Sequence, residues 1–164
     1  MAIVSAICNS FKEEILQGGH CLNASGSTAA GNTIKLALYS AKDAVLSKST
    51  TVYAAPADAS ADPTSTYEVT TTSSGYTGGG NTLTNIDVTL DSDIAVCDFA
   101  DTSWTSASFT ARGCLLYNTT AITGFTTNRS VIVINFGGDK TVTSGTFTIE
   151  FPAAAASTAI IQLA

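Results

Sequence analysis

Apolar and polar residues alternate most clearly in the second half of the chain. Phe147, Ile149 and Phe151 are separated by single polar residues, which is the period of two expected of a half-buried strand. The apolar run 130–136 precedes this segment, and the Gly-rich residues 137–140 follow that run. This order predicts two strands joined as an antiparallel hairpin.

Other segments combine apolar alternation or short apolar runs with flanking turn residues, and these features predict further strands. They are 33–39, 82–90, 94–99 and 99–117, with shorter segments at 121–125 and 159–163. In the first, Ile34, Leu36 and Leu38 should form its one buried face.

Two of these segments carry more specific expectations. In 82–90, Ile86, Val88 and Leu90 should share a face, and the Asp-Ser-Asp run that follows predicts a turn. In 99–117, Gly113 predicts a bend or bulge between two strand segments, because glycine tolerates backbone angles that a Cβ forbids.

One segment near the start has helical rather than strand periodicity. Ile7, Phe11 and Ile15 recur at about 3.6 residues, which predicts a helix over 5–17 with Leu16 near its apolar side. The pair Gly18-Gly19 supplies a C-terminal stop.

The length and the order of elements bound the architecture. At 164 residues, we expect one domain, 1–164, large enough to bury its own core. Within it, 1–32 should form an N-terminal helix and arm, 41–80 a long irregular loop and 81–164 the main sheet region. Many short strands with one helix at the front predict a mainly β protein, a jelly-roll-like antiparallel β-sandwich.

The charge excludes some functions. A net charge of −6 with only seven Lys and Arg residues disfavours nucleic-acid binding, which requires a basic surface. No apolar run approaches the ~20 residues of a membrane span. The start lacks the basic region of a secretory signal, so we expect a soluble protein made in a cytoplasm.

The four cysteines are widely spaced. Cys8, Cys97 and Cys114 lie among apolar residues, which favours buried free thiols. A Cys8–Cys21 disulfide is the alternative, and zinc is disfavoured because Cys-x-x-Cys spacing is absent.

Few residues suggest catalysis. His20, the only histidine, is expected to cap the preceding helix or to pack against the core, although any histidine-based triad would have to include it. A further group of acidic residues suits turns, with a calcium site or a glycosidase pair as alternatives. The group comprises Asp87, Asp91, Asp93, Asp98 and Asp101.

Two remaining features also have structural explanations. Trp104 is expected to anchor the β core, with sugar stacking as the alternative. The Gly-rich runs 78–80 and 137–140 match no phosphate-binding pattern and predict turns. We therefore expect no enzyme, with no catalytic, cofactor-binding or metal-binding residues and no cofactor.

A set of motifs in a fixed order covers nearly the whole chain. The motifs are Phe11–His20, Ile34–Ser40, Tyr67–Val69, Gly75–Gly80, Phe99–Trp104, Ala111–Asn118, Phe136–Lys140 and Phe147–Pro152. In this order they resemble a family of small structural proteins of tailed-bacteriophage virions. The chain departs from the family pattern in a longer segment, 50–66, and in its cysteines.

The resemblance implies a virion component. Some similar small β-sandwich proteins are capsid cement or decoration proteins, so the expected location is the outer capsid surface. The expected partners are the major capsid protein and further copies of the chain, as a dimer or trimer. The alternative is a protein of the tail or fibre base with receptor or carbohydrate binding.

Overall fold

The computed structural model describes residues 3–23, 31–40, 46–53, 67–69 and 74–164, except for the side chains of Ile86 and Asp87. One helix and eight strands lie in these ranges. They are β1 (Ala6–Ile7), α1 (Asn9–Leu16), β2 (Ile34–Tyr39), β3 (Asn81–Thr82), β4 (Asn85–Asp91), β5 (Ile94–Phe99), β6 (Thr102–Asn118), β7 (Arg129–Ile149) and β8 (Ile161–Leu163).

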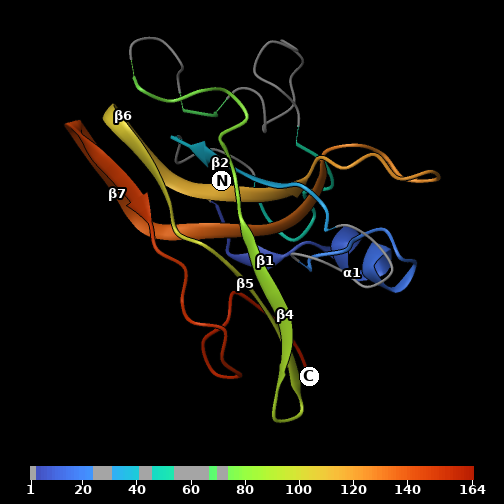
Figure 1. Ribbon diagram of the computed structural model, residues 1–164. Coiled ribbons are helices and arrows are strands. Elements are labelled where there is room, and N and C mark those ends of the chain that lie inside the picture. The colour runs from blue at the N-terminus through green and yellow to red at the C-terminus, as the bar shows by residue number, and fades with distance from the viewer. Residues whose placement is uncertain (1–2, 24–30, 41–45, 54–66, 70–73) are drawn as a thin grey trace.

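The strands form two antiparallel sheets. One has the order β1-β7-β6-β2-β3 and the other the order β4-β5-β8. In Figure 1 the β6–β7 pair forms a long curved ribbon, and the β4–β5 hairpin projects away from it. The predicted mainly β fold with one N-terminal helix is confirmed, whereas the jelly-roll arrangement is not.

The predicted hairpin within 130–151 is wrong. Residues 129–149 form a single strand, β7, whose partner along its length is β6. Asn135 lies opposite Gly113, and Lys140 lies opposite Ala111, so the intervening residues form a bulge rather than a reversal. Gly137, with φ of 76°, provides the left-handed backbone that this bulge requires.

The predicted irregularity at Gly113 is confirmed, but within one continuous strand. The register of β6 shifts between Ala111 and Gly113. A Cβ at this position would lie 2.5 Å from the carbonyl oxygen of Ile134. Glycine therefore permits the close approach of β6 and β7 here.

Strand β2 is buried on both faces rather than one. It pairs with β6 on one side and with β3 on the other. Ile34, Leu36 and Leu38 are fully buried as predicted, but so are Ala37 and Tyr39 on the opposite face. The alternation therefore located the strand but underestimated how much of it is covered.

Helix α1 begins four residues later than predicted. Residues Ala6–Ile7 instead pair with β7 as β1, and Cys8 has the extended backbone of an N-cap. Phe11 is buried as expected, but Leu16 is 89% exposed. Gly18, with φ of 77°, ends the helix as predicted.

The remaining local predictions hold in part. The predicted strand 82–90 is divided, with β3 in the five-stranded sheet and β4 in the three-stranded one. Strands β5 and β8 lie where the sequence places them, and Ser92 and Asp93 form the turn between β4 and β5. Residues 121–125 form a turn rather than a strand. Trp104 is 4% exposed and packs against Tyr76, Phe109 and Phe147, which confirms its role in the core.

The segment 41–80 lies partly outside the described residues. Its described parts are well packed: Leu46, Tyr53, Val69 and Tyr76 all belong to the hydrophobic core. The described parts of the expected irregular loop therefore contribute to the core, and two of them pair with β2 and β7 through single bridges, Glu68 with Tyr39 and Val52 with Arg129.

Candidate functional site

His20 lies in a buried polar cluster between α1 and the five-stranded sheet. Its Nε2 atom is 2.7 Å from a carboxylate oxygen of Glu14, and its Nδ1 atom is 3.0 Å from the side-chain nitrogen of Asn118. The same Asn118 nitrogen also donates to the side-chain oxygen of Asn32. Arg129 completes the cluster, with its Nε atom 3.5 Å from Glu14.

This geometry fixes the protonation state of His20. Because the amide nitrogen of Asn118 can only donate, Nδ1 must accept and carries no proton. Nε2 therefore carries the proton and donates a hydrogen bond to the carboxylate of Glu14. Both ring nitrogens are engaged within the protein, so the packing interpretation is favoured over a catalytic triad.

The cluster makes a prediction for pH. Burial lowers the pKa of His20 from 6.5, although the hydrogen bond to Glu14 opposes this shift. The unfolded chain therefore binds the proton more tightly than the folded one. The contribution of neutral His20 to the free energy of unfolding should be complete above pH 6.5. It should decrease as the pH falls from 6.5 towards the lowered pKa of the folded state, by up to about 1.4 kcal/mol per pH unit.

Urea unfolding between pH 7.5 and 5.5 measures this effect, with His20→Gln as the matched variant. The stability of the variant should vary less over this range than that of the wild type, because residue 20 no longer titrates. Equal slopes for the two proteins would contradict a neutral buried His20.

Glu68 forms a second buried cluster, which was not predicted as a site. One carboxylate oxygen accepts hydrogen bonds from the Tyr76 hydroxyl and the Gly79 backbone N–H, both at 2.6 Å. The other accepts from the Tyr53 hydroxyl at 2.9 Å. The Tyr117 hydroxyl donates to the Gly79 carbonyl, and its ring stacks on Tyr53.

Burial raises the pKa of Glu68 above its usual value, and the three hydrogen bonds oppose that shift. Nothing in the periodicity of the sequence marks this residue, because its partners come from separate segments of 41–80. The cluster ties these segments to one another and, through the bond from the Leu38 N–H to the Tyr76 hydroxyl, to β2.

The acidic residues of 87–101 occupy separate positions. Asp91 accepts from the Ala156 N–H, Asp98 from the adjacent Phe99 N–H and Asp101 from the Phe151 N–H. Asp93 lies in the β4–β5 turn. The side chain of Asp87 lies outside the described part. Within that part, no three His, Cys, Asp or Glu side chains come close enough to hold a metal ion.

The cysteines and the glycine run 78–80 fit their predicted structural roles, whereas the run 137–140, also predicted to be a turn, lies within β7 as a bulge. Cys8, Cys97 and Cys114 are buried, and all four cysteines are free, so the alternative Cys8–Cys21 disulfide is not formed. Burial raises the pKa of the Cys8 thiol to about 12. Residues 78–80 form a turn as predicted, and the turn packs against the Glu68 cluster.

The candidate interaction site is one face of the β4-β5-β8 sheet. The pairing places Val88, Cys97 and Ile161 in one row across the strands, and Leu90, Ala95 and Leu163 in the next. Cys97 and Ile161 are buried, whereas Val88, Leu90 and Leu163 are 42%, 72% and 47% exposed. We call these six residues the apolar face.

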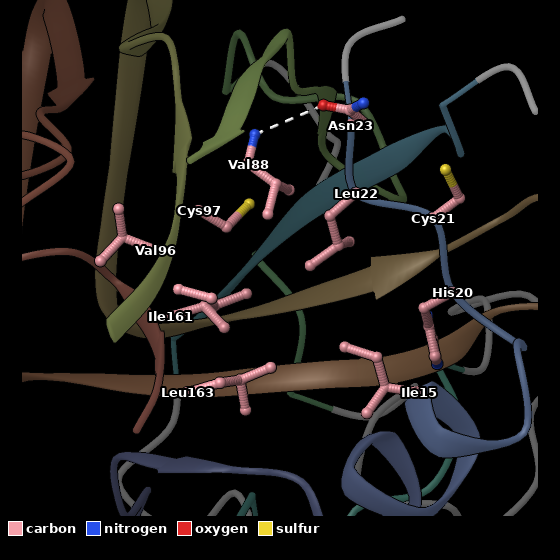
Figure 2. Close-up of a pocket in the computed structure, with 11 residues that line it drawn as sticks. Ile15, His20, Cys21, Leu22, Asn23, Val88, Val96, Cys97, Ile161 and Leu163 are labelled. Carbon is pink, nitrogen blue, oxygen red and sulfur yellow. Dashed lines mark hydrogen bonds between the residues drawn. The ribbon is translucent and has the colours of Figure 1, made fainter. Parts of the chain in front are cut away.

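The apolar face borders a cavity of about 380 Å³. Figure 2 shows Ile161 and Leu163 on one side of this cavity, with Ile15 and Leu22 on the other. The prediction that Val88 and Leu90 share a face is confirmed. However, neither side chain is fully covered by the rest of the protein, and Leu90 is the more exposed of the two.

A second apolar groove, of about 500 Å³, lies along β7 and the C-terminal segment. Phe136, Phe147 and Phe151 line it, together with Ile160 and the charged Lys140. Its aromatic residues pack against the core, so less of each side chain is exposed than at Leu90. We therefore regard the apolar face as the stronger candidate.

Two further observations bear on function. The helix in the described residues, α1, has eight residues and is too short to cross a membrane. No protein-family model, curated protein or solved structure matches this chain.

Proposed function

We propose that this protein is a structural component of a tailed-bacteriophage virion, a cement or decoration protein on the outside of the capsid shell. It would bind neighbouring major capsid subunits and stabilise their contacts. The sequence motifs support this proposal by resemblance. The observation that carries it is the apolar face, where three large aliphatic side chains are exposed together on one sheet.

Such a face favours lasting contact with another protein. Exposed aliphatic side chains gain free energy when a partner covers them, at about 25 cal/mol per Å² of apolar area. Only 12% of the residues are charged, so few charges need to lose water at an interface. Many copies on a symmetric shell would add avidity to each modest contact.

The two buried clusters support this function as structural elements. The side chains of His20 and Glu68 form their hydrogen bonds with other residues of the protein. These hydrogen bonds connect loops to the five-stranded sheet. A rigid domain loses less conformational freedom when it binds. The acidic balance of the chain also fits an outer location, away from packaged DNA.

Quantitative mass spectrometry of purified virions tests the proposal. The expected copy number is equal to that of the major capsid protein or a simple fraction set by the symmetry of the shell. A count that matches tail symmetry would instead favour the tail or fibre-base alternative. Absence from virions would overturn both.

Leu90 offers a direct test of the face. Because its side chain is 72% exposed, Leu90→Lys should change the free energy of unfolding by less than about 0.5 kcal/mol. Sedimentation with capsids that lack the protein should show at least about tenfold weaker binding for the variant, which corresponds to about 1.4 kcal/mol. Val4→Lys, at an exposed apolar position outside the cavity lining, is the matched control and should bind normally.

A further inference from the structure

The charged groups around the apolar face indicate what kind of partner covers it. The β4–β5 hairpin contains four aspartates and no lysine or arginine between Asn85 and Phe99. Asp91 and Asp98 pair with Ile94 and Asp87 and so lie on the opposite face from Leu90, while Asp93 is exposed at the turn. The face is therefore apolar, with acidic groups behind it and at its tip.

The neighbouring elements do not offset this charge. The segment 152–164, which includes β8, has no charged side chain, and the loop 20–23 has none beyond the neutral His20. On α1, the charge of exposed Lys12 is balanced by that of exposed Glu13. Glu14 is paired with His20 and Arg129. At physiological salt the Debye length is about 8 Å, so exposed Asp93 acts directly on charges of a partner at the hairpin tip, while the aspartates of the opposite face add to the negative potential around the hairpin.

We infer that the apolar face binds an apolar segment of a partner protein that is bordered by lysine or arginine residues. Apolar side chains of the segment cover Leu90, Val88 and Leu163 and enter the cavity beside Ile15. Its basic residues lie near Asp93, at the tip of the hairpin beside the face. The inference rests on the proposed function only for where the partner is found, on the capsid shell.

The same charges argue against a second copy as the occupant. Two copies joined through this face would bring two acidic hairpins together, and like charges held close at an interface weaken binding. A basic partner gains from the same arrangement, chiefly in the rate of association. Binding should therefore weaken as salt is raised.

Binding of two synthetic peptides to the intact protein tests this inference. Both have the same leucine- and valine-rich centre, and one has lysines at both ends whereas the other has glutamates. Fluorescence anisotropy should show at least about tenfold tighter binding of the lysine peptide, a difference of about 1.4 kcal/mol. The difference should shrink when the salt concentration is raised from 50 mM to 300 mM.

Variants locate the binding. Leu90→Thr and Leu163→Thr should each weaken binding of the lysine peptide, while Val4→Thr should leave it unchanged. Asp93→Asn should reduce the preference for lysine over glutamate without removing the apolar contribution. Circular dichroism and urea unfolding of each variant establish that it is folded.

Three results would overturn the inference: equal binding of the two peptides, binding that Leu90→Thr leaves intact, or self-association through this face. These outcomes are separate from the copy number on virions. A chain absent from virions that still binds the lysine peptide contradicts the proposed function alone. A chain present in capsid stoichiometry that shows no preference contradicts this inference alone.

Discussion

Replacing Glu68 with alanine is expected to lower the free energy of unfolding by about 3–5 kcal/mol. The change removes the acceptor for the Tyr53 hydroxyl, the Tyr76 hydroxyl and the Gly79 N–H, all of which are buried. Each buried donor left without a partner costs about 1–3 kcal/mol. Chemical denaturation monitored by tryptophan fluorescence measures the loss, because Trp104 packs against Tyr76.

Two further variants separate the contributions at this site. Glu68→Gln keeps an acceptor for Tyr76 and Gly79, and the Tyr53 hydroxyl can rotate to accept from the new amide, so a smaller loss of about 1–2 kcal/mol is expected. Glu13→Ala, on the exposed side of α1, is the control and should cost less than about 0.5 kcal/mol. A loss below about 1 kcal/mol for Glu68→Ala would show that the cluster contributes little.

The pH dependence that Glu68 gives the wild-type protein should oppose that of His20. Because burial raises the pKa of Glu68 above 4.5, the folded state holds its proton more tightly than the unfolded state. The resulting stabilisation is fully present below pH 4.5 and is lost as the pH rises through the raised value. Glu68→Gln should remove this decline, whereas His20→Gln should remove the opposite trend below pH 6.5.

Replacing Arg129 with methionine should cost about 3–5 kcal/mol. The Arg129 side chain is fully buried, and its guanidinium donates to the carbonyl oxygens of Thr126 and Gly19. It also lies 3.5 Å from Glu14 and 5.4 Å from the centre of the Phe125 ring. Methionine fills similar space but leaves both carbonyls and the carboxylate without this partner.

A second arginine provides the control for Arg129. Arg112 forms a salt bridge with Asp139, but the two side chains are 32% and 59% exposed. Because solvent screens such a pair, Arg112→Met should cost less than about 1 kcal/mol. Similar losses for Arg112→Met and Arg129→Met would contradict a structural role for burial at Arg129.

A double variant tests whether Glu14 causes part of the Arg129 loss. In Arg129→Met/Glu14→Gln, the carboxylate that has lost the positive charge of Arg129, but keeps its hydrogen bond with His20, is replaced by a neutral group. If that uncompensated charge contributes to the loss, the double variant should be more stable than Arg129→Met alone.

Two of the failed predictions, the hairpin within 130–151 and the start of the helix, share one origin. Two runs have the composition of strands, Val131–Asn135 and Phe147–Ile149. A Gly-rich segment between two such runs favours a hairpin. The two runs belong to one strand because β6 is long enough to pair with both. Likewise, Ala6 and Ile7 leave the helix because β7 offers them a sheet edge. Tertiary pairing overrides local propensity in each case.

The sequence by itself determined the mainly β class, the positions of β2, β5 and β8, the stop at Gly18 and the burial of Cys114 and Trp104. These follow from local alternation and from residue chemistry, both of which act within a few positions of the chain. Alternation fixes which side chains share a face, but not what covers that face. Only the tertiary structure decided that Tyr39 is enclosed and that Leu90 is exposed. It also brought distant donors around Glu68, because a buried carboxylate is stable only where several segments supply hydrogen bonds at once.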